Sequence, residues 1–218
     1  MAQVVSRNAI GDVNLVFHAK QASSFFDSCV FLGCVGSRLA EAVLSTNLGA
    51  HQMAEITFHG TTINTSGSLP AVGSEAPPLV LTGKDGGSIS LADFAGQRLV
   101  LNIFPSVDTP TCAMSVRTFN ERAASLENAT VLCVSADLPM AQNRFCGAEA
   151  IERVQTGSTF RNPQVLDDYG VRIVDGPLEG LAARAVVVLD ETVTVLHAEL
   201  VGELADQPDY EAALSVLQ

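Results

Sequence analysis

Short apolar runs and one amphipathic stretch dominate the second half of the chain. Residues 98–104 and 130–136 are largely apolar, which is typical of strands in the middle of a sheet that is covered on both faces. Over residues 111–126, apolar side chains recur at steps of three and four, which predicts a helix with one apolar face. The strand, helix and strand in this order predict a parallel strand pair joined by a crossover helix.

Two β-hairpins are predicted upstream of this unit. Alternating positions on either side of His59-Gly60 predict a hairpin over residues 56–64. A second hairpin is predicted over residues 79–91, where short runs flank the turn Lys84 to Gly87. Residues 66–78 are rich in Gly, Ser and Pro and therefore read as a loop.

The remaining elements complete an α/β pattern. Asp137-Leu138-Pro139 predicts a helix that begins with Asp137 as its N-cap and a proline in its first turn. Two strands are predicted over 184–190 and 193–201, followed by a helix over 208–217. We therefore expect a thioredoxin-like fold, with a central mixed β-sheet flanked by helices, an N-terminal β-hairpin, and a terminal hairpin that supplies antiparallel edge strands.

Composition and charge narrow the possible functions. Of the 218 residues, 47% are apolar and 17% are charged, which is a globular balance. The formal net charge of −12 argues against nucleic acid as a partner, because nucleic-acid binding needs clustered Lys and Arg. Residues 1–52 contain three acidic and three basic residues, so the whole net charge belongs to residues 53–218. We expect 53–218 to be the folded domain, and 1–52 to be an extension that is poorly ordered or arises from a non-native start.

Cysteine spacing favours thiol redox chemistry. Five cysteines, at positions 29, 34, 112, 133 and 146, form no CxxC pair and have no zinc-like histidine spacing, so we expect neither a metal nor a cofactor. Their odd number argues against a purely structural disulfide framework and favours a reducing compartment. No apolar run approaches the length of a membrane span, and we expect a cytoplasmic protein without membrane or nucleic-acid partners.

Cys112 is the main candidate for chemistry. It follows a predicted strand and a turn that contains Pro105 and Pro110, in the first turn of the predicted helix. Unpaired backbone N–H groups at a helix start favour negative charge, so a cysteine there can become a reactive thiolate; the alternative is a thiol that only packs in the core. Thr109 lies close enough in sequence for its hydroxyl to turn toward the sulfur.

Arg184 and Cys146 have two possible interpretations each, and Cys133 has one. Arg184, at the start of an apolar strand, is either a solvated charge or a cation that holds the Cys112 thiolate. Cys146, in the next predicted helix, is either a packed thiol or a partner that attacks oxidised Cys112 to form a disulfide. That bond needs the two Cα atoms within about 7 Å, so at least one helix would have to unwind locally. Cys133, within an apolar strand, is expected in the core.

Several longer stretches carry a specific resemblance that covers essentially the whole of residues 53–218. They are Asn102 to Cys112, Ser135 to Pro139, Arg144 to Cys146, Asp175 to Leu178, Ala183 to Val186 and Pro208 to Leu214. In these stretches the chain resembles the bacterial thiol peroxidases, the atypical two-cysteine peroxiredoxins. The chain departs from the family pattern at Met140, where Phe is usual, and in residues 1–52, which have no counterpart.

The resemblance implies an antioxidant enzyme that reduces alkyl hydroperoxides and hydrogen peroxide. It implies a peroxidatic Cys112, a resolving Cys146, a Cys112–Cys146 disulfide, and Thr109 and Arg184 as activating groups. It further implies a homodimer that is recycled by thioredoxin. Two alternatives remain at this point. One is a redox sensor or interaction module without turnover, and the other is a general thiol–disulfide oxidoreductase, which would normally show CxxC where this chain has Cys112 to Ser115.

Overall fold

A computed structural model describes residues 53–218, and the expectation of an extension over 1–52 falls outside the described residues. The helices are α1 (Pro110–Arg122), α2 (Pro139–Ala148), α3 (Gln164–Asp168) and α4 (Tyr210–Ser215). The strands are β1 (Glu55–Phe58), β2 (Thr61–Asn64), β3 (Val80–Thr82), β4 (Ser88–Ser90), β5 (Arg98–Ile103), β6 (Ala129–Ser135), β7 (Val154–Ser158), β8 (Ala185–Leu189) and β9 (Val195–Leu200).

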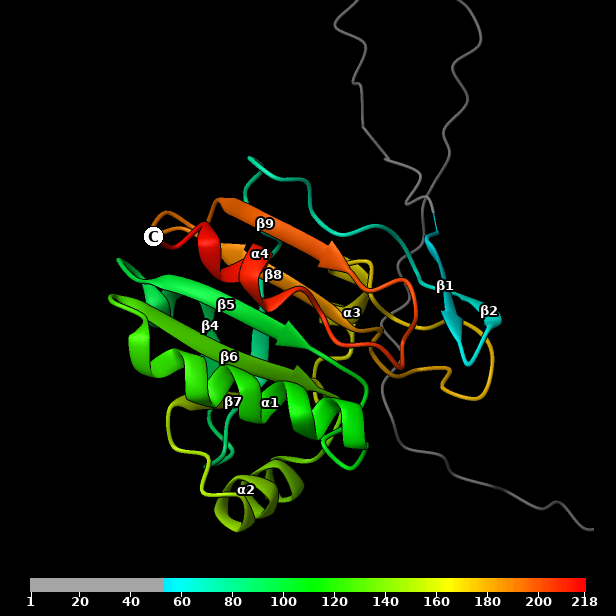
Figure 1. The fold of residues 1–218 in the computed structure, drawn as a ribbon, viewed down its shortest axis with the longest axis horizontal. Helices are drawn as coiled ribbons and strands as arrows, with labels where there is room; N and C mark the ends of the chain where they lie inside the picture. Colours follow the sequence, from blue (N-terminus) through cyan, green and yellow to red (C-terminus); the bar gives the residue numbers. More distant parts are fainter. Residues whose placement is uncertain (1–52) are drawn as a thin grey trace, which may run out of the picture. The chain divides into compact units, whose positions relative to one another are not determined.

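Seven of these strands form one mixed sheet in the order β4-β3-β7-β6-β5-β8-β9 (Figure 1). The β5–β6 and β6–β7 pairs are parallel, whereas β8 runs antiparallel to β5. The β1–β2 hairpin is separate and turns at His59 and Gly60, whose φ angles of 50° and 76° are those of a tight hairpin turn. The predicted thioredoxin-like arrangement is therefore confirmed.

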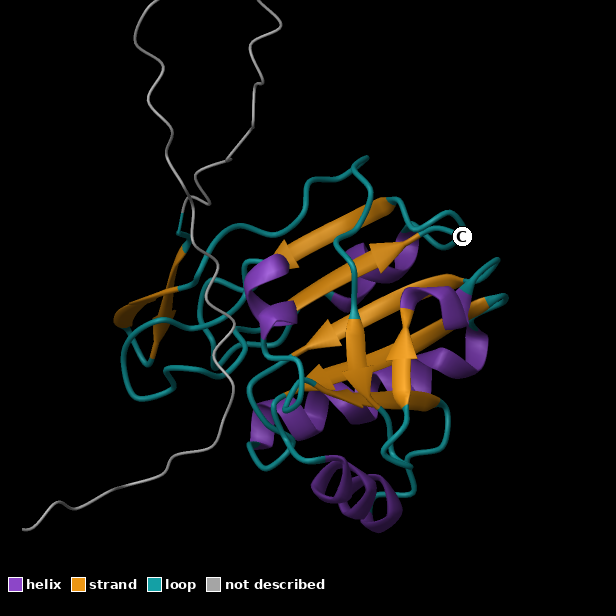
Figure 2. Cartoon of the chain, turned by 180° about the vertical axis from the view of Figure 1, so that it is seen from behind, coloured by secondary structure: helices purple, strands orange, loops and turns teal. Residues whose placement is uncertain are grey.

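Side chains of the central strands alternate between two cores. In β5, Leu99, Leu101 and Ile103 pack into one cluster with α3 and the β1–β2 hairpin, while Val100 packs into the other. The second cluster contains the apolar face of α1 and the buried residues of α4. Figure 2 shows helices on both sides of the sheet. Because both faces are covered, these strands are almost entirely apolar, as the sequence pattern indicated.

Three expectations about the elements need correction. The prediction missed β7, because Val154–Ser158 is polar apart from its first residue and its strand state comes from pairing with β6. It also missed the five-residue helix α3. The terminal hairpin does not supply two edge strands, since β8 lies between β5 and β9 and only β9 forms the edge.

The predicted N-cap of α2 is also wrong. Leu138 occupies the cap position and makes no side-chain capping bond. The Asp137 carboxylate instead accepts hydrogen bonds from the Ser106 hydroxyl at 2.7 Å, the Val107 N–H at 2.8 Å and the Ser135 hydroxyl at 2.7 Å. These three donors give the carboxylate more hydrogen bonds than the single N–H group that an N-cap side chain would bind. The tertiary contacts therefore determine where the Asp137 side chain points.

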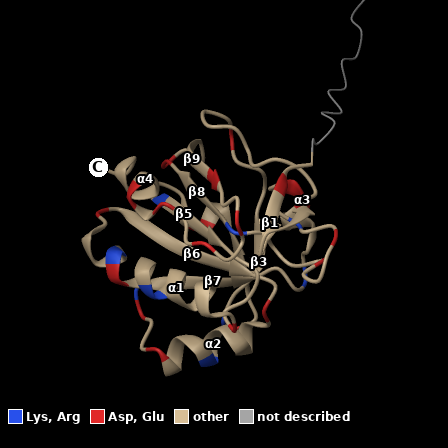
Figure 3. Cartoon of the chain, turned by 45° about the vertical axis from the view of Figure 1, so that its right-hand side comes forward, with Lys and Arg blue, Asp and Glu red and all other residues tan. Residues whose placement is uncertain are grey.

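Charged residues are spread over several elements. Figure 3 shows acidic residues on α3, α4 and several loops, with fewer basic residues among them. Among residues 53–218, no helix has both the length and the apolar character needed to cross a membrane.

Candidate active site

The first turn of α1 is built around Thr109 and Cys112. Thr109 is the N-cap in an extended conformation, Pro110 opens the helix, and Cys112 is its third residue. The Thr109 hydroxyl oxygen accepts a hydrogen bond from the Cys112 N–H at 3.4 Å, which satisfies one of the free N–H groups at the helix start. Cys112 is fully buried, so its sulfur lies at a helix N-terminus that is shielded from bulk water.

Thr109 acts on the backbone in this structure. Its hydroxyl donates to the Ser106 carbonyl at 3.2 Å and accepts from the Cys112 N–H, so its proton is directed away from the sulfur. From the sequence, the hydroxyl was expected to turn toward the sulfur itself. In this structure Thr109 therefore holds the turn that carries Cys112.

Arg184 lies beside Cys112 because β8 is antiparallel to β5. Ala185, the first residue of β8, pairs with Ile103, the last residue of β5, and the turn to α1 begins directly after Ile103. This register places Arg184 Nη2 3.4 Å from Cys112 Sγ, across 72 residues of sequence. The guanidinium charge therefore favours negative charge on the sulfur. The reading of Arg184 as a solvated charge is wrong, since only 1% of its surface is exposed.

The guanidinium is fixed by one carbonyl and keeps one donor free. Leu204 C=O accepts hydrogen bonds from Arg184 Nε at 3.2 Å and Nη2 at 3.1 Å. Nη1 is buried and has no hydrogen-bond partner among the described residues. Burying a cationic donor unpaired is unfavourable, so Nη1 is available to an oxygen atom that enters beside Cys112.

The Leu204 carbonyl is itself held by the N-terminal hairpin. Leu204 N–H donates to Thr57 C=O at 2.8 Å, and the Glu203 carboxylate accepts from the Thr57 hydroxyl at 2.8 Å and from the His59 and Gly60 N–H groups at 3.0 and 3.1 Å. These hydrogen bonds, together with one from Ala205, lower the pKa of Glu203 to about 2. Leu204 could not be identified from the sequence, because every residue type has a backbone carbonyl.

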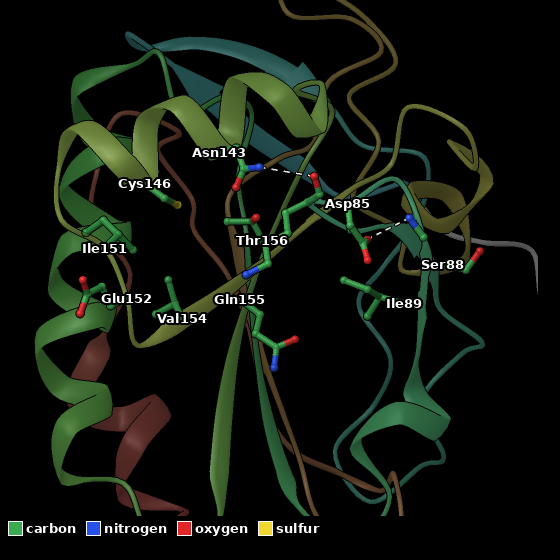
Figure 4. A pocket seen from close by; sticks show the side chains of 13 residues that line it. Asp85, Ser88, Ile89, Asn143, Cys146, Ile151, Glu152, Val154, Gln155 and Thr156 are labelled. Carbon is green, nitrogen blue, oxygen red and sulfur yellow. Dashed lines mark hydrogen bonds between the residues drawn. The ribbon is translucent and has the colours of Figure 1, made fainter.

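Cys146 lies on α2 beside a different cavity. It is half-buried and lines an open hollow of about 680 Å³ between α2 and the β3–β4 turn, to which Cys112 does not contribute (Figure 4). The Asn143 amide donates to the Lys84 carbonyl across this hollow at 3.4 Å. Burial raises the pKa of the Cys146 thiol, and the nearby charge of Lys84 opposes that shift.

The described cysteines are all free thiols, so Cys112 and Cys146 are not bonded in this state. Both lie in helices, as expected. Cys133 is in the core as predicted. It lies 3.6 Å from the Asn102 amide, and burial raises its pKa to about 12, so it remains a neutral thiol.

In the part of the chain that the structure describes, no group of three or more His, Cys, Asp or Glu side chains is arranged to hold a metal ion.

Comparison with known proteins identifies the family. Residues 71–214 match the Redoxin family. Proteins called thiol peroxidase from Mycobacterium bovis and Mycobacterium tuberculosis are each 59% identical to this chain over 165 residues, which is 76% of this chain and 99% of theirs.

Solved structures agree with this result. A peroxiredoxin-like protein from Aquifex aeolicus superposes with a TM-score of 0.71 at 35% identity, covering 76% of this chain and 97% of that protein. A thiol peroxidase from Chromobacterium violaceum, at 20% identity, shares the fold with a TM-score of 0.68 over 75% of this chain and 95% of its own. Because relatives called thiol peroxidase are 59% identical and align over 99% of their own length, and because a buried arginine contacts a thiol at a helix start, the chain belongs to the bacterial thiol peroxidases of the Redoxin family.

Proposed function

We propose that Cys112 is the peroxidatic cysteine of a thiol-dependent peroxidase. The Cys112 thiolate attacks the terminal oxygen of a hydroperoxide, the O–O bond breaks, and the sulfur becomes a sulfenic acid. The departing oxygen takes up a proton and leaves as water or an alcohol. The observation that carries this proposal is the buried Arg184 guanidinium, with Nη2 3.4 Å from the sulfur and Nη1 free for an oxygen.

Arg184 and Thr109 have separate roles in this step. Arg184 stabilises the thiolate before the reaction and the negative charge on the peroxide oxygens during it. Thr109 holds the helix start through its bonds to Cys112 N–H and Ser106 C=O, and so fixes the direction of attack. Because the environment is fixed before the peroxide arrives, little reorganisation is required during the reaction.

Cys146 is proposed as the resolving cysteine. Its thiol attacks the Cys112 sulfenic acid, a Cys112–Cys146 disulfide forms, and water leaves. Thioredoxin then reduces the disulfide by thiol–disulfide exchange. The half-buried position of Cys146 on a neighbouring helix supports a partner role, and it disfavours a sensor that oxidises without turnover.

The family resemblance supports several further parts of the proposal. We infer that alkyl hydroperoxides are preferred over hydrogen peroxide, that the protein acts as a homodimer in the cytoplasm, and that its role is antioxidant defence. Residues 53–218 are proposed as the catalytic domain, with 1–52 as an extension outside it. The mycobacterial relatives, called thiol peroxidases, align with the chain over 99% of their length.

Thioredoxin-coupled consumption of cumene hydroperoxide tests the function. The wild-type protein is expected to turn over, and Cys112→Ser to show no activity. Cys146→Ser should reduce one equivalent of peroxide and then stop as a sulfenic acid, which a dimedone adduct reveals by mass spectrometry. Cys133→Ser is the matched control and should retain turnover. Normal steady-state activity of Cys112→Ser would refute the assignment.

A further inference from the structure

A chain of buried and half-buried polar side chains joins the helix of Cys146 to the turn before Cys112. The Gln142 amide N–H group donates to the Ser135 hydroxyl at 2.9 Å and to the Gly157 carbonyl at 3.2 Å. The Ser135 hydroxyl donates to the Asp137 carboxylate at 2.7 Å. That carboxylate also accepts the Ser106 hydroxyl at 2.7 Å and the Val107 N–H at 2.8 Å.

Each end of this chain lies close to one of the two cysteines. Gln142 is one helical turn before Cys146 on α2. At the other end, the Ser106 carbonyl accepts both the hydroxyl and the N–H of Thr109 at 3.2 Å, and Thr109 caps the helix of Cys112. The polar chain therefore connects the two cysteine-bearing helices through the end of β6.

Gln142 attaches helix α2 to the sheet by polar contacts, beside the apolar contacts of Phe145 and Cys146. Pro139 and Gln142 are the buried residues of the helix, and Gln142 is 1% exposed. The Gln142 amide oxygen is buried and has no hydrogen-bond partner among the described residues. An unsatisfied buried acceptor is unfavourable, so it offsets part of the stabilisation that the two hydrogen bonds of Gln142 provide.

We propose that Gln142, Ser135 and Asp137 are positioning residues that couple release of α2 to loosening of the first turn of α1. The inference rests on the proposed function, in which Cys112 and Cys146 form a disulfide. While the polar chain is intact, Cys112 stays buried beside Arg184. When Gln142 leaves Ser135, the Ser135 hydroxyl loses the donor that orients it toward the Asp137 carboxylate, and the Ser106-Val107 turn that this carboxylate holds loosens.

The coupling has a consequence for the oxidised enzyme. A sulfenic acid on Cys112 either meets the Cys146 thiol, giving the disulfide and water, or meets a second hydroperoxide, giving a sulfinic acid and water or an alcohol. The second reaction needs the closed state, because the peroxide reacts beside Arg184. The polar chain therefore sets the ratio of disulfide to sulfinic acid at high peroxide.

Amide hydrogen exchange on the reduced protein tests the coupling without any turnover. Gln142→Met keeps the length and burial of the side chain but removes its donors. We expect exchange to become about three- to tenfold faster in the distant peptide 104–113, the factor that follows from one lost hydrogen bond. Asn143→Ala, on the same helix but bonded to the Lys84 carbonyl instead, should leave peptide 104–113 unchanged.

The reverse direction provides a second measurement. Since coupling is reciprocal, Asp137→Asn should accelerate exchange within α2. If the faster exchange in Gln142→Met stays within α2 and peptide 104–113 is unaffected, the proposed coupling is wrong. If Gln142→Met does not fold, Ser135→Ala removes a single hydroxyl from the same series of hydrogen bonds. Its amide exchange in peptide 104–113 then tests the coupling.

A peroxide titration then separates this inference from the proposed function. With excess cumene hydroperoxide, the sulfinic acid fraction of Gln142→Met should fall about threefold relative to wild type and to Asn143→Ala, as read by intact mass. An unchanged fraction refutes the effect on oxidation. A wild-type protein that consumes no peroxide refutes the proposed function, whereas the exchange result still decides the coupling.

Discussion

Arg184 Nη2 lies 3.4 Å from Cys112 Sγ, and both side chains are withdrawn from solvent. The contact joins the residue before β8 to the first turn of α1, and it exists because β8 is antiparallel to β5. Leu204 C=O fixes the guanidinium through two hydrogen bonds, so the free Nη1 has a defined direction. Contacting the Leu204 carbonyl and the Cys112 sulfur together requires the several N–H donors that a guanidinium holds in one plane, and it requires the arginine to be buried.

Replacement of Arg184 by lysine tests this requirement. A single ammonium group cannot bind the Leu204 carbonyl, face the sulfur and offer a further donor at the same time. We expect Arg184→Lys to slow sulfenic acid formation about a hundredfold or more, the usual effect of losing a charge-stabilising donor. Stopped-flow kinetics of peroxide reduction in a single turnover measures this rate.

Arg172→Lys provides the matched control for that change. Arg172 binds the Asp167 carboxylate through Nε and Nη2 at 2.7 and 2.8 Å and has no contact with Cys112. This variant should react with peroxide at the wild-type rate. Equal slowing in both variants would mean that the loss reflects general destabilisation and has no connection with the thiol.

The helix cap at Thr109 gives a second prediction. Thr109→Val removes the hydroxyl that accepts from Cys112 N–H, and loss of such a cap costs about 1 kcal/mol in the free energy of unfolding. We also expect slower peroxide reduction, because Cys112 loses its fixed orientation, and recovery of the rate in Thr109→Ser. Urea unfolding and single-turnover kinetics measure the two effects.

A cap elsewhere separates stability from chemistry. Asp209 caps α4 by accepting from the Ala212 N–H at 2.9 Å. Asp209→Ala should lower the free energy of unfolding by a similar amount, about 1 kcal/mol, with the peroxide rate retained. If it slows peroxide reduction as much as Thr109→Val does, the specific role of Thr109 is refuted.

The pKa of Cys146 gives a pH-dependent prediction. Burial raises this pKa in the folded protein, so the thiol is neutral at pH 7 and alkylates only as pH rises. In reduced Cys112→Ser, the midpoint of Cys146 alkylation by iodoacetamide should lie above that of the same protein in urea. Peptide mass spectrometry assigns the modified cysteine at each pH.

Replacement of Lys84 should change the pH dependence of Cys146 alkylation. Its charge lowers the Cys146 pKa, so Lys84→Met should shift the midpoint of alkylation further toward alkaline pH. Arg161→Met is the control, because Arg161 donates to the Gly86 carbonyl on the same turn. A profile that is identical in wild type and Lys84→Met would contradict the electrostatic effect.

Acid stability tests the link between the hairpin and the Leu204 segment. The folded pKa of Glu203 is about 2, below its ordinary value of 4.5, because hydrogen bonds from Ala205, Gly60, Thr57 and His59 favour the carboxylate. Because its pKa is lower in the folded protein, the ionised Glu203 carboxylate contributes its full stabilisation of the fold above pH 4.5. This contribution is lost as pH falls toward 2. Glu203→Gln should therefore lose less stability than wild type over that interval, as measured by thermal unfolding. Parallel acid curves for the two proteins would contradict this.

Much of this protein follows from local sequence. Largely apolar strands around an amphipathic helix predicted the core of the sheet, because burial on both faces leaves no room for polar alternation. The turn before Cys112 and its helix start are local features, so the position of this cysteine in the first turn of α1 was predicted without tertiary information. The polar strand β7 was not predicted, because its strand conformation depends on pairing with β6 and not on its own composition.

The tertiary structure determined which distant groups meet that thiol. The antiparallel register of β8 brings Arg184 to Cys112, and the β1–β2 hairpin fixes the Leu204 carbonyl that orients it. Asp137 was predicted to cap α2 but binds the Ser106-Val107 turn, because three donors converge there only after folding. Sequence patterns record local preferences for helix, strand and charge, whereas the direction of a buried polar side chain depends on partners that only the packed fold supplies.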